Sequence, residues 1–203
     1  MVSLVIQAGG ESRRMGADKA LLPFLGQPLI LRSLSRLSGL ADEVLVTSNH
    51  PGSYRFLGLT PIPDRLPGCG ALGGLYTALS VARYPYVAVV ACDMPFASPE
   101  IFAIELVLLQ ETEVDAVIPH SKAGVEPFHA VYRRESCLPY IQSALEAGKR
   151  RVGAWFSQVN IRYLEIGEML AHDPDQLAFL NINTPEELQE AERIAREDTG
   201  IDN

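Results

Sequence analysis

The chain has 203 residues and a formal net charge of −8 at pH 7, with 47% hydrophobic and 21% charged residues. The length suits a single well-packed domain, and the balance of apolar and charged residues is ordinary for a globular protein. The acidic balance argues against a broad nucleic-acid-binding face, and no stretch approaches the ~20 consecutive apolar residues of a membrane-spanning helix. We therefore expect neither a nucleic acid nor a membrane as a partner.

Three cysteines, Cys69, Cys92 and Cys137, have no spacing typical of metal ligands and do not form an even set. They are interpreted as free thiols in a reducing compartment. The N-terminus begins with an apolar run typical of a strand, not with a signal peptide. Together these features predict a cytoplasmic protein.

Apolar runs and helical spacings alternate along the first half of the chain. In chain order they predict a strand at 2–6, a helix at 29–37, a strand at 44–47, a glycine-rich turn at 67–74 followed by a helix at 75–82, a strand at 86–91, a helix at 101–110 and a strand at 115–119. Ser98 and Pro99 are typical of the cap and the first turn of a helix. Residues 86–91 are almost all apolar, as in a parallel strand buried on both faces.

The second half is less regular. It predicts strands at 128–132 and 162–165, a helix at 135–147 that ends at Gly148, and a C-terminal helix that begins at Thr184. Repeating β-α units predict a three-layer α/β/α sandwich with a mostly parallel, Rossmann-like sheet. No linker, repeat or low-complexity segment divides the chain, so residues 1–203 are expected to form a single domain.

The most informative feature is the turn that follows the first strand. It contains glycines at positions 9, 10 and 16 together with Arg13, Arg14 and Lys19. Glycines let backbone N–H groups approach the oxygens of a ligand closely, and the three cations are donors suited to phosphate. A turn of this kind at the carboxyl edge of an α/β sheet predicts a phosphate-binding loop.

The loop has neither the Walker spacing of a P-loop nor the pattern G-x-G-x-x-G. It resembles the signature of nucleotidyltransferases that activate small molecules, roughly A-G/A-G-x-S-x-R-M-G-x-x-K, and in particular the molybdenum cofactor guanylyltransferase branch. The matching residues are Ala8-Gly9-Gly10-Glu11-Ser12-Arg13-Arg14-Met15-Gly16-Ala17-Asp18-Lys19.

This resemblance implies transfer of GMP from GTP to molybdopterin, with release of pyrophosphate, by a Mg²⁺-dependent enzyme whose fold is of the nucleotide-diphospho-sugar transferase type. It also implies a nucleotide half at about 1–110 and an acceptor half at about 111–200. Transient contacts with other molybdenum cofactor proteins are expected as well.

Lys19, Arg13 and Asp93 are the catalytic candidates. Lys19 places a point charge on a long side chain at the end of the loop. One of the two arginines, Arg13 and Arg14, is expected to face the phosphates and the other to face solvent. Asp93 follows the strand at 86–91, at the sheet edge where ligands bind. The run Cys92-Asp93-Met94-Pro95 resembles the family's C/G-D-x-P element, which implies that Asp93 holds Mg²⁺ and contacts the nucleotide; a turn or helix cap is the alternative.

The resemblance implies further nucleotide contacts. Asn49, which could instead be a plain turn residue, and Asp64 match family positions at the nucleotide, and backbone groups of Gln7, Ala8 and Gly9 would line the base and ribose. The family usually has Leu where this chain has Gln7, so a role for that side chain stays open. Gly9 removes a methyl group where a purine would lie; this favours GTP over CTP, by only ~1–3 kcal/mol.

The acceptor is expected to bind to the second half. The cations Lys149, Arg150 and Arg151 suit the anionic end of molybdopterin, and their alternative role is to complement a helix dipole. Asn181 and Asn183 either orient polar groups of the pterin or cap the helix at Thr184. His129 is either a packed histidine or an acid or base.

Other functions fit the same loop. They are a cytidylyltransferase for the same pterin, a nucleotidyltransferase for a sugar phosphate or phospholactate, and a non-catalytic nucleotide-binding protein that delivers the cofactor. The presence of both Lys19 and Asp93 argues against the last, because a chain without catalysis is free to lose its metal ligand.

Overall fold

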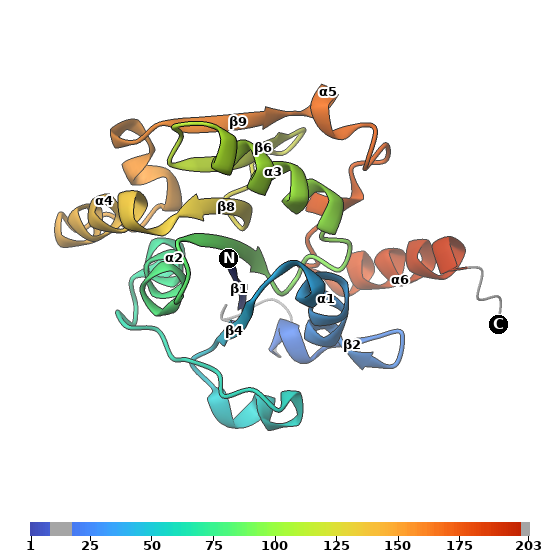
Figure 1. Cartoon of the computed structure of the whole chain (residues 1–203). Helices are drawn as coiled ribbons and strands as arrows, with labels where there is room; N and C mark the ends of the chain where they lie inside the picture. Colours follow the sequence, from blue (N-terminus) through green and yellow to red (C-terminus); the bar gives the residue numbers. More distant parts are fainter. Residues whose placement is uncertain (9–17, 200–203) are drawn as a thin grey trace.

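A computed structural model describes residues 1–8 and 18–199 of the chain. In this part a seven-stranded sheet lies between two layers of helices (Figure 1). The strands are β1 (Val2–Gln7), β4 (Glu43–Thr47), β5 (Tyr86–Ala91), β6 (Ala116–Ser121), β7 (Gly124–Val125), β8 (His129–Arg133) and β9 (Ile161–Glu165). A separate short hairpin pairs β2 (Pro23–Phe24) with β3 (Gln27–Pro28).

The sheet is mostly parallel, as predicted. Its order is β4-β1-β5-β8-β6-β7, and β9 also pairs with β6. Strand β1 is parallel to β4 and β5, while β9 is parallel to β6. Strand β8 is antiparallel to both β5 and β6, so β6 runs in the same direction as β5. The pairing of β5 with β8 joins the strands of the first half to those of the second.

Helices cover both faces of the sheet, which confirms the three-layer sandwich. The α-helices are α1 (Leu29–Leu37), α2 (Gly70–Val81), α3 (Pro99–Glu111), α4 (Arg134–Glu146), α5 (Ile166–Met169) and α6 (Pro185–Thr199). Alternate residues of β1 separate the two cores, because successive side chains of a strand point to opposite faces. Leu4 and Ile6 pack on the side of α1 and α3, whereas Val5 packs on the side of α2 and α4.

Short 3₁₀ segments connect these elements. They are η1 (Lys19–Leu21), η2 (Ser38–Leu40), η3 (Pro51–Leu57), η4 (Val152–Gln158) and η5 (Leu177–Phe179). Helix α6 lies apart from the sheet in Figure 1, and its buried Ala191 and Ala195 pack with Phe24, Phe96 and Ile182. This small cluster holds the end of the chain against the hairpin and against the segment that follows β5.

The start of α2 corrects one prediction. The helix begins at Gly70, so residues 70–74 are helical and not part of the turn expected at 67–74. Gly68 and Gly70 have φ angles of +75° and +61°, which satisfies the expected bend. Gly73 serves close packing instead: a Cβ there would lie 2.6 Å from the Cβ of Cys69 and 3.2 Å from the carbonyl oxygen of Leu66.

The predicted helix ends agree with the structure. The Ser98 side chain accepts a hydrogen bond from the Ile101 N–H with Pro99 in the first turn, and Gly148 has a φ of +77° just after α4. Among the described residues, no helix combines the length and the apolar character needed to cross a membrane.

Candidate active site

The carboxyl ends of three parallel strands bring the first-half site residues to one edge of the sheet. Gln7, at the end of β1, is paired in register with Thr47 of β4 and with Ala91 of β5. The residues that follow these strands therefore share this edge, where open α/β sheets bind ligands. Gly9 and Arg13 lie outside the described residues, and their expected roles stay predictions.

Lys19 connects three distant parts of the chain. Its Nζ donates to Asp93 Oδ2 at 2.9 Å and to Asn183 Oδ1 at 2.7 Å. The Lys19 and Asp93 side chains are only 17% and 18% exposed, so this ion pair is partly shielded from water. The structure thus places the predicted cation and the predicted metal ligand in direct contact, together with a residue assigned from sequence to the acceptor.

Tyr54 fixes the start of the segment that carries Lys19. The fully buried Tyr54 donates its OH to Asp18 Oδ2 at 2.5 Å, and the Tyr54 hydroxyl oxygen also lies 3.3 Å from the carbonyl oxygen of Ala8. Asp18 in turn caps η1 by accepting from the Ala20 N–H. Burial and the neighbouring Asp18 raise the pKa of Tyr54, so the phenol remains a donor. Sequence reasoning missed Tyr54 because it belongs to no motif.

Asn49 and Asp64 meet beyond the end of β4. The Asn49 amide nitrogen donates to Asp64 Oδ2 at 2.8 Å, and the Asp64 backbone N–H donates to Asn49 Oδ1 at 3.0 Å. A bridge between Thr47 and Ile62 aligns the two segments, which brings the pair to the same edge as Lys19 and Asp93. The two predicted nucleotide contacts therefore form one unit.

Asp93 fits a Mg²⁺ ion that is shared with phosphates. The described residues contain no group of three or more His, Cys, Asp or Glu side chains that could enclose a metal ion. Mg²⁺ needs only one or two carboxylates when substrate phosphates and water complete its octahedral shell. The single carboxylate of Asp93 at the sheet edge has this character, so it could hold Mg²⁺ but not build an all-protein site.

The run Lys149, Arg150 and Arg151 is exposed and lies beside the start of α2. The Leu72 N–H donates to the carbonyl oxygen of Arg150 at 3.4 Å. The Arg150 guanidinium donates to the carbonyl oxygens of Leu145, at 3.4 Å, and Lys149, at 2.9 Å. For Arg150 this is the alternative contact expected from the sequence, a cation at the carboxyl end of a helix.

Neither predicted asparagine caps α6. The cap is made by Thr184, whose Oγ1 accepts from the Glu187 N–H, and by Glu187, whose carboxylate accepts from the Asn183 and Thr184 N–H groups. The Asn181 side chain donates to the carbonyl oxygen of Phe179 at 3.1 Å. The side-chain oxygen Oδ1 of Asn183 instead accepts a hydrogen bond from Lys19, so this side chain does not cap the helix.

His129 is a packed histidine. It is fully buried, its ring stacks on Phe102 with centroids 4.0 Å apart, and its Nε2 accepts from the Ser98 N–H at 3.2 Å. Since Nε2 accepts, the ring proton is on Nδ1, which faces Glu105 Oε1 at 3.2 Å. Burial lowers the pKa of His129 to about 3 and raises that of Glu105, so both shifts favour the neutral form of the side chain.

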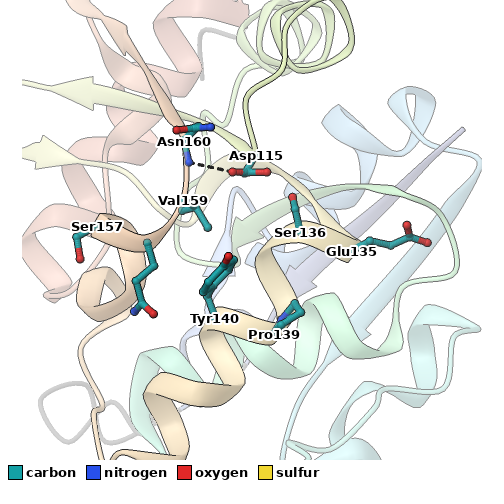
Figure 2. Close-up of a pocket in the computed structure, with 9 residues that line it drawn as sticks. Asp115, Glu135, Ser136, Pro139, Tyr140, Ser157, Val159 and Asn160 are labelled. Atoms are coloured by element: carbon teal, nitrogen blue, oxygen red, sulfur yellow. Dashed lines mark hydrogen bonds between the residues drawn. The ribbon is translucent and has the colours of Figure 1, made fainter.

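A cavity of about 570 Å³ opens at the opposite edge of the sheet (Figure 2). Asp115 and Asn160, which precede β6 and β9, form one wall, and the Asn160 N–H donates to Asp115 Oδ2 at 2.9 Å. Pro139 and Tyr140 of α4 form another wall. None of the predicted site residues lines this cavity.

Comparisons with known proteins identify similar chains over nearly the full length. The probable molybdenum cofactor guanylyltransferase of Pelotomaculum thermopropionicum is 35% identical over 94% of this chain and 92% of its own length. The molybdenum cofactor guanylyltransferase of Desulfosudis oleivorans is 33% identical over 94% of both chains. The crystal structure of molybdopterin-guanine dinucleotide biosynthesis protein A from Archaeoglobus fulgidus superposes with a TM-score of 0.84 at 26% identity, covering 96% of this chain and 99% of that one.

Residues 4–161 also match the MobA-like NTP transferase domain. This match spans β1 to the start of β9 and includes Lys19 and Asp93. This match over most of the chain and the two relatives over nearly full length lead to the same assignment: the chain belongs to the MobA-like NTP transferase family.

Proposed function

We propose that this protein transfers GMP from GTP to molybdopterin, forming molybdopterin guanine dinucleotide and pyrophosphate. The observation that carries the proposal is the contact of Lys19 with both Asp93 and Asn183, because it joins the nucleotide loop, the sheet edge and the C-terminal segment at one point. The names of the relatives that match over nearly full length support the choice of substrates. With three unpaired cysteines, the protein suits a reducing cytoplasm.

Lys19, Asp93 and Arg13 would carry the chemistry. The reaction places negative charge on the α-phosphate and on the departing pyrophosphate, so positioning and electrostatic stabilisation dominate. The ammonium group of Lys19 would contact these oxygens, with Arg13 as a second cation. Asp93 would hold Mg²⁺, which supplies charge neutralisation when bound.

The two substrates would meet at Lys19. Gln7, Ala8 and Gly9 would line the nucleotide together with Asn49 and Asp64, which already form one unit. Molybdopterin would be met by Asn181 and Asn183, and its anionic end by Lys149, Arg150 and Arg151. Contacts with other molybdenum cofactor proteins would deliver the acceptor and receive the product.

A nucleotide panel tests the proposal. The protein is incubated with GTP, CTP, ATP or UTP, with Mg²⁺ and molybdopterin, and both pyrophosphate and the dinucleotide are measured. We expect turnover with GTP to exceed that with the other nucleotides, and dependence on Mg²⁺. Equal or faster turnover with CTP would overturn the guanylyl assignment, and no pyrophosphate with any nucleotide would favour a binding protein.

The Asp93→Asn variant belongs to the same assay. Loss of the carboxylate charge should lower kcat by roughly 10²-fold or more with the fold intact, because electrostatic contacts in a transition state have effects of this size. Glu135→Gln is the matched control, since it removes one exposed carboxylate at the opposite edge of the sheet. Unchanged turnover of Asp93→Asn would remove Asp93 from the site.

A further inference from the structure

Gln7 carries a buried donor that the described structure does not use. Its Nε2 has essentially no accessible surface and no hydrogen-bond partner among the described residues. Leaving an amide N–H₂ group buried without an acceptor is unfavourable, and native proteins rarely do so without a reason. An aliphatic side chain would fill this position without that penalty.

The Gln7 amide lies between the end of β1 and the start of α2. Along β1, Val5 and Gln7 share the face that packs against α2. A Cβ built on Gly74 would lie 3.3 Å from Gln7 Oε1 and 3.5 Å from Nε2. The absence of a side chain at Gly74 therefore leaves the space that the amide occupies.

The same corner of the site contains the Asn49–Asp64 unit. Gln7 pairs with Thr47, two residues before Asn49. On the other side, the N–H of Arg65, next to Asp64, donates to Thr77 Oγ1, one turn of α2 beyond Gly74. The Gln7 amide thus lies where the ends of β1 and β4 meet the start of α2, and its unused donor is free for a ligand bound at this edge of the sheet.

We propose that the Gln7 side chain recognises the base of the nucleotide, with Nε2 donating to the O6 oxygen of guanine and Oε1 accepting from N1–H. This rests on the proposed function, because it takes the nucleotide to be GTP. An amide offers a donor beside an acceptor, which matches the O6 and N1–H edge of guanine. With the amide in this orientation, the amino group that adenine carries at the same position would place two donors against each other.

Equilibrium binding tests this without the acceptor. GTP, ITP and ATP compete with a fluorescent GTP analogue in the presence of Mg²⁺; ITP keeps O6 and N1–H but lacks the 2-amino group. For the wild type we expect GTP and ITP to bind more tightly than ATP. Gln7→Leu should weaken the binding of GTP and ITP about tenfold, because one or two buried hydrogen bonds are lost. The affinity for ATP should not change.

Gln7→Glu gives an effect that a structural role would not produce. Its carboxylate repels O6 but accepts from the amino group of adenine, so the preference for GTP over ATP should fall further than in Gln7→Leu. An equal loss for all three nucleotides, or an unchanged ratio of GTP to ATP affinity in both variants, would overturn the proposal. Thermal unfolding shows whether each variant is folded.

Gly74→Ala tests the same amide without changing it. The new Cβ would crowd Gln7 Oε1 and should reduce the preference for GTP, although alanine favours a helix. In a Gln7→Ala background the Gly74→Ala change should have no further effect on that preference. An effect of equal size in both backgrounds would contradict the inference.

Different results would overturn the proposed function and the proposed role of Gln7. Tighter binding of CTP than of GTP by the wild type would overturn the proposed function and the guanine contact together. A wild-type preference for GTP that survives in Gln7→Leu would overturn only the role of Gln7.

Discussion

At the scale of single residues, the site depends on side chains that hold other side chains in place. Tyr54 contacts neither Lys19 nor Asp93, yet its hydroxyl connects the end of β1 to Asp18, which caps the 3₁₀ turn that begins with Lys19. Tyr54 is therefore a positioning residue for Lys19.

Tyr54→Phe tests this role by removing one oxygen atom. We expect the free energy of unfolding to fall by about 1 kcal/mol, the net value of one buried hydrogen bond. We also expect KM for GTP to rise several-fold, because η1 loses its fixed start. Tyr140→Phe on α4 is the matched control, since Tyr140 is 40% exposed and distant from this edge. A loss of stability with an unchanged KM would limit Tyr54 to a structural role.

At the scale of elements, the start of α2 shows what sequence patterns leave out. Clustered glycines indicate a turn, and Gly68 and Gly70 do make one. Gly73 is already helical, and it lacks a side chain because the chain just before the helix, at Leu66 and the N-cap Cys69, folds closely against this position. A cluster of glycines alone does not show which of them make the turn and which allow this close approach. Strand bounds were predictable for β1, β4 and β5, because their apolar runs pack on both faces, fully in β1 and β5 and partly in the edge strand β4.

Gly73→Ala separates packing from helix propensity. An alanine would gain ~1 kcal/mol of propensity but would place its Cβ 2.6 Å from that of Cys69. We expect a net loss of about 1–3 kcal/mol in the free energy of unfolding, as for overpacked interiors. Urea denaturation measures it, and Gly167→Ala in α5, with no atom near its Cβ, is the control that should not be destabilised. A stabilised Gly73→Ala would show that α2 shifts freely at this end.

At the scale of the whole molecule, the buried Glu105–His129 pair connects α3 and β8 and makes stability depend on pH. The ordinary pKa of a glutamate side chain is 4.5, and burial raises that of Glu105 well above it. Above pH 4.5 the native carboxyl therefore keeps a proton that the unfolded chain releases, so this term lowers stability as pH rises toward the raised pKa. For His129 the pKa falls from 6.5 to about 3, so its term raises stability with pH inside that interval.

The Glu105→Gln variant isolates the contribution of this glutamate to the pH dependence of stability. Both proteins keep His129, so the histidine term largely cancels in the difference; between pH 4.5 and the raised pKa of Glu105 the wild type should lose up to about 1.4 kcal/mol per pH unit relative to the variant. The side-chain amide oxygen introduced by the substitution can still accept from His129 Nδ1, which keeps the contact. Unfolding of both proteins is measured in urea at several pH values upward from about 5. A difference that does not change with pH would mean that Glu105 is ionised in the native state.

The whole-molecule arrangement was only partly predictable. The loop motif and the strand ends placed Lys19 and Asp93 at one edge, because parallel strands share their carboxyl ends. The approach of Asn183 to Lys19 was not predictable, since it depends on the packing of α6 against Phe24 and Phe96. The apolar pattern of β8 predicted a strand but not its antiparallel direction, because the direction depends on its pairing with β5 and β6.

The contact between Lys19 and Asn183 has a consequence for the newly made polypeptide. These residues are 164 positions apart, so Lys19 and Asp93 leave the ribosome long before Asn183 does. Strands β1, β4 and β5 can pair during synthesis, whereas the contact of Lys19 with Asn183 must wait for the segment that precedes α6. This contact therefore belongs to the last stage of folding, after most of the chain has been made.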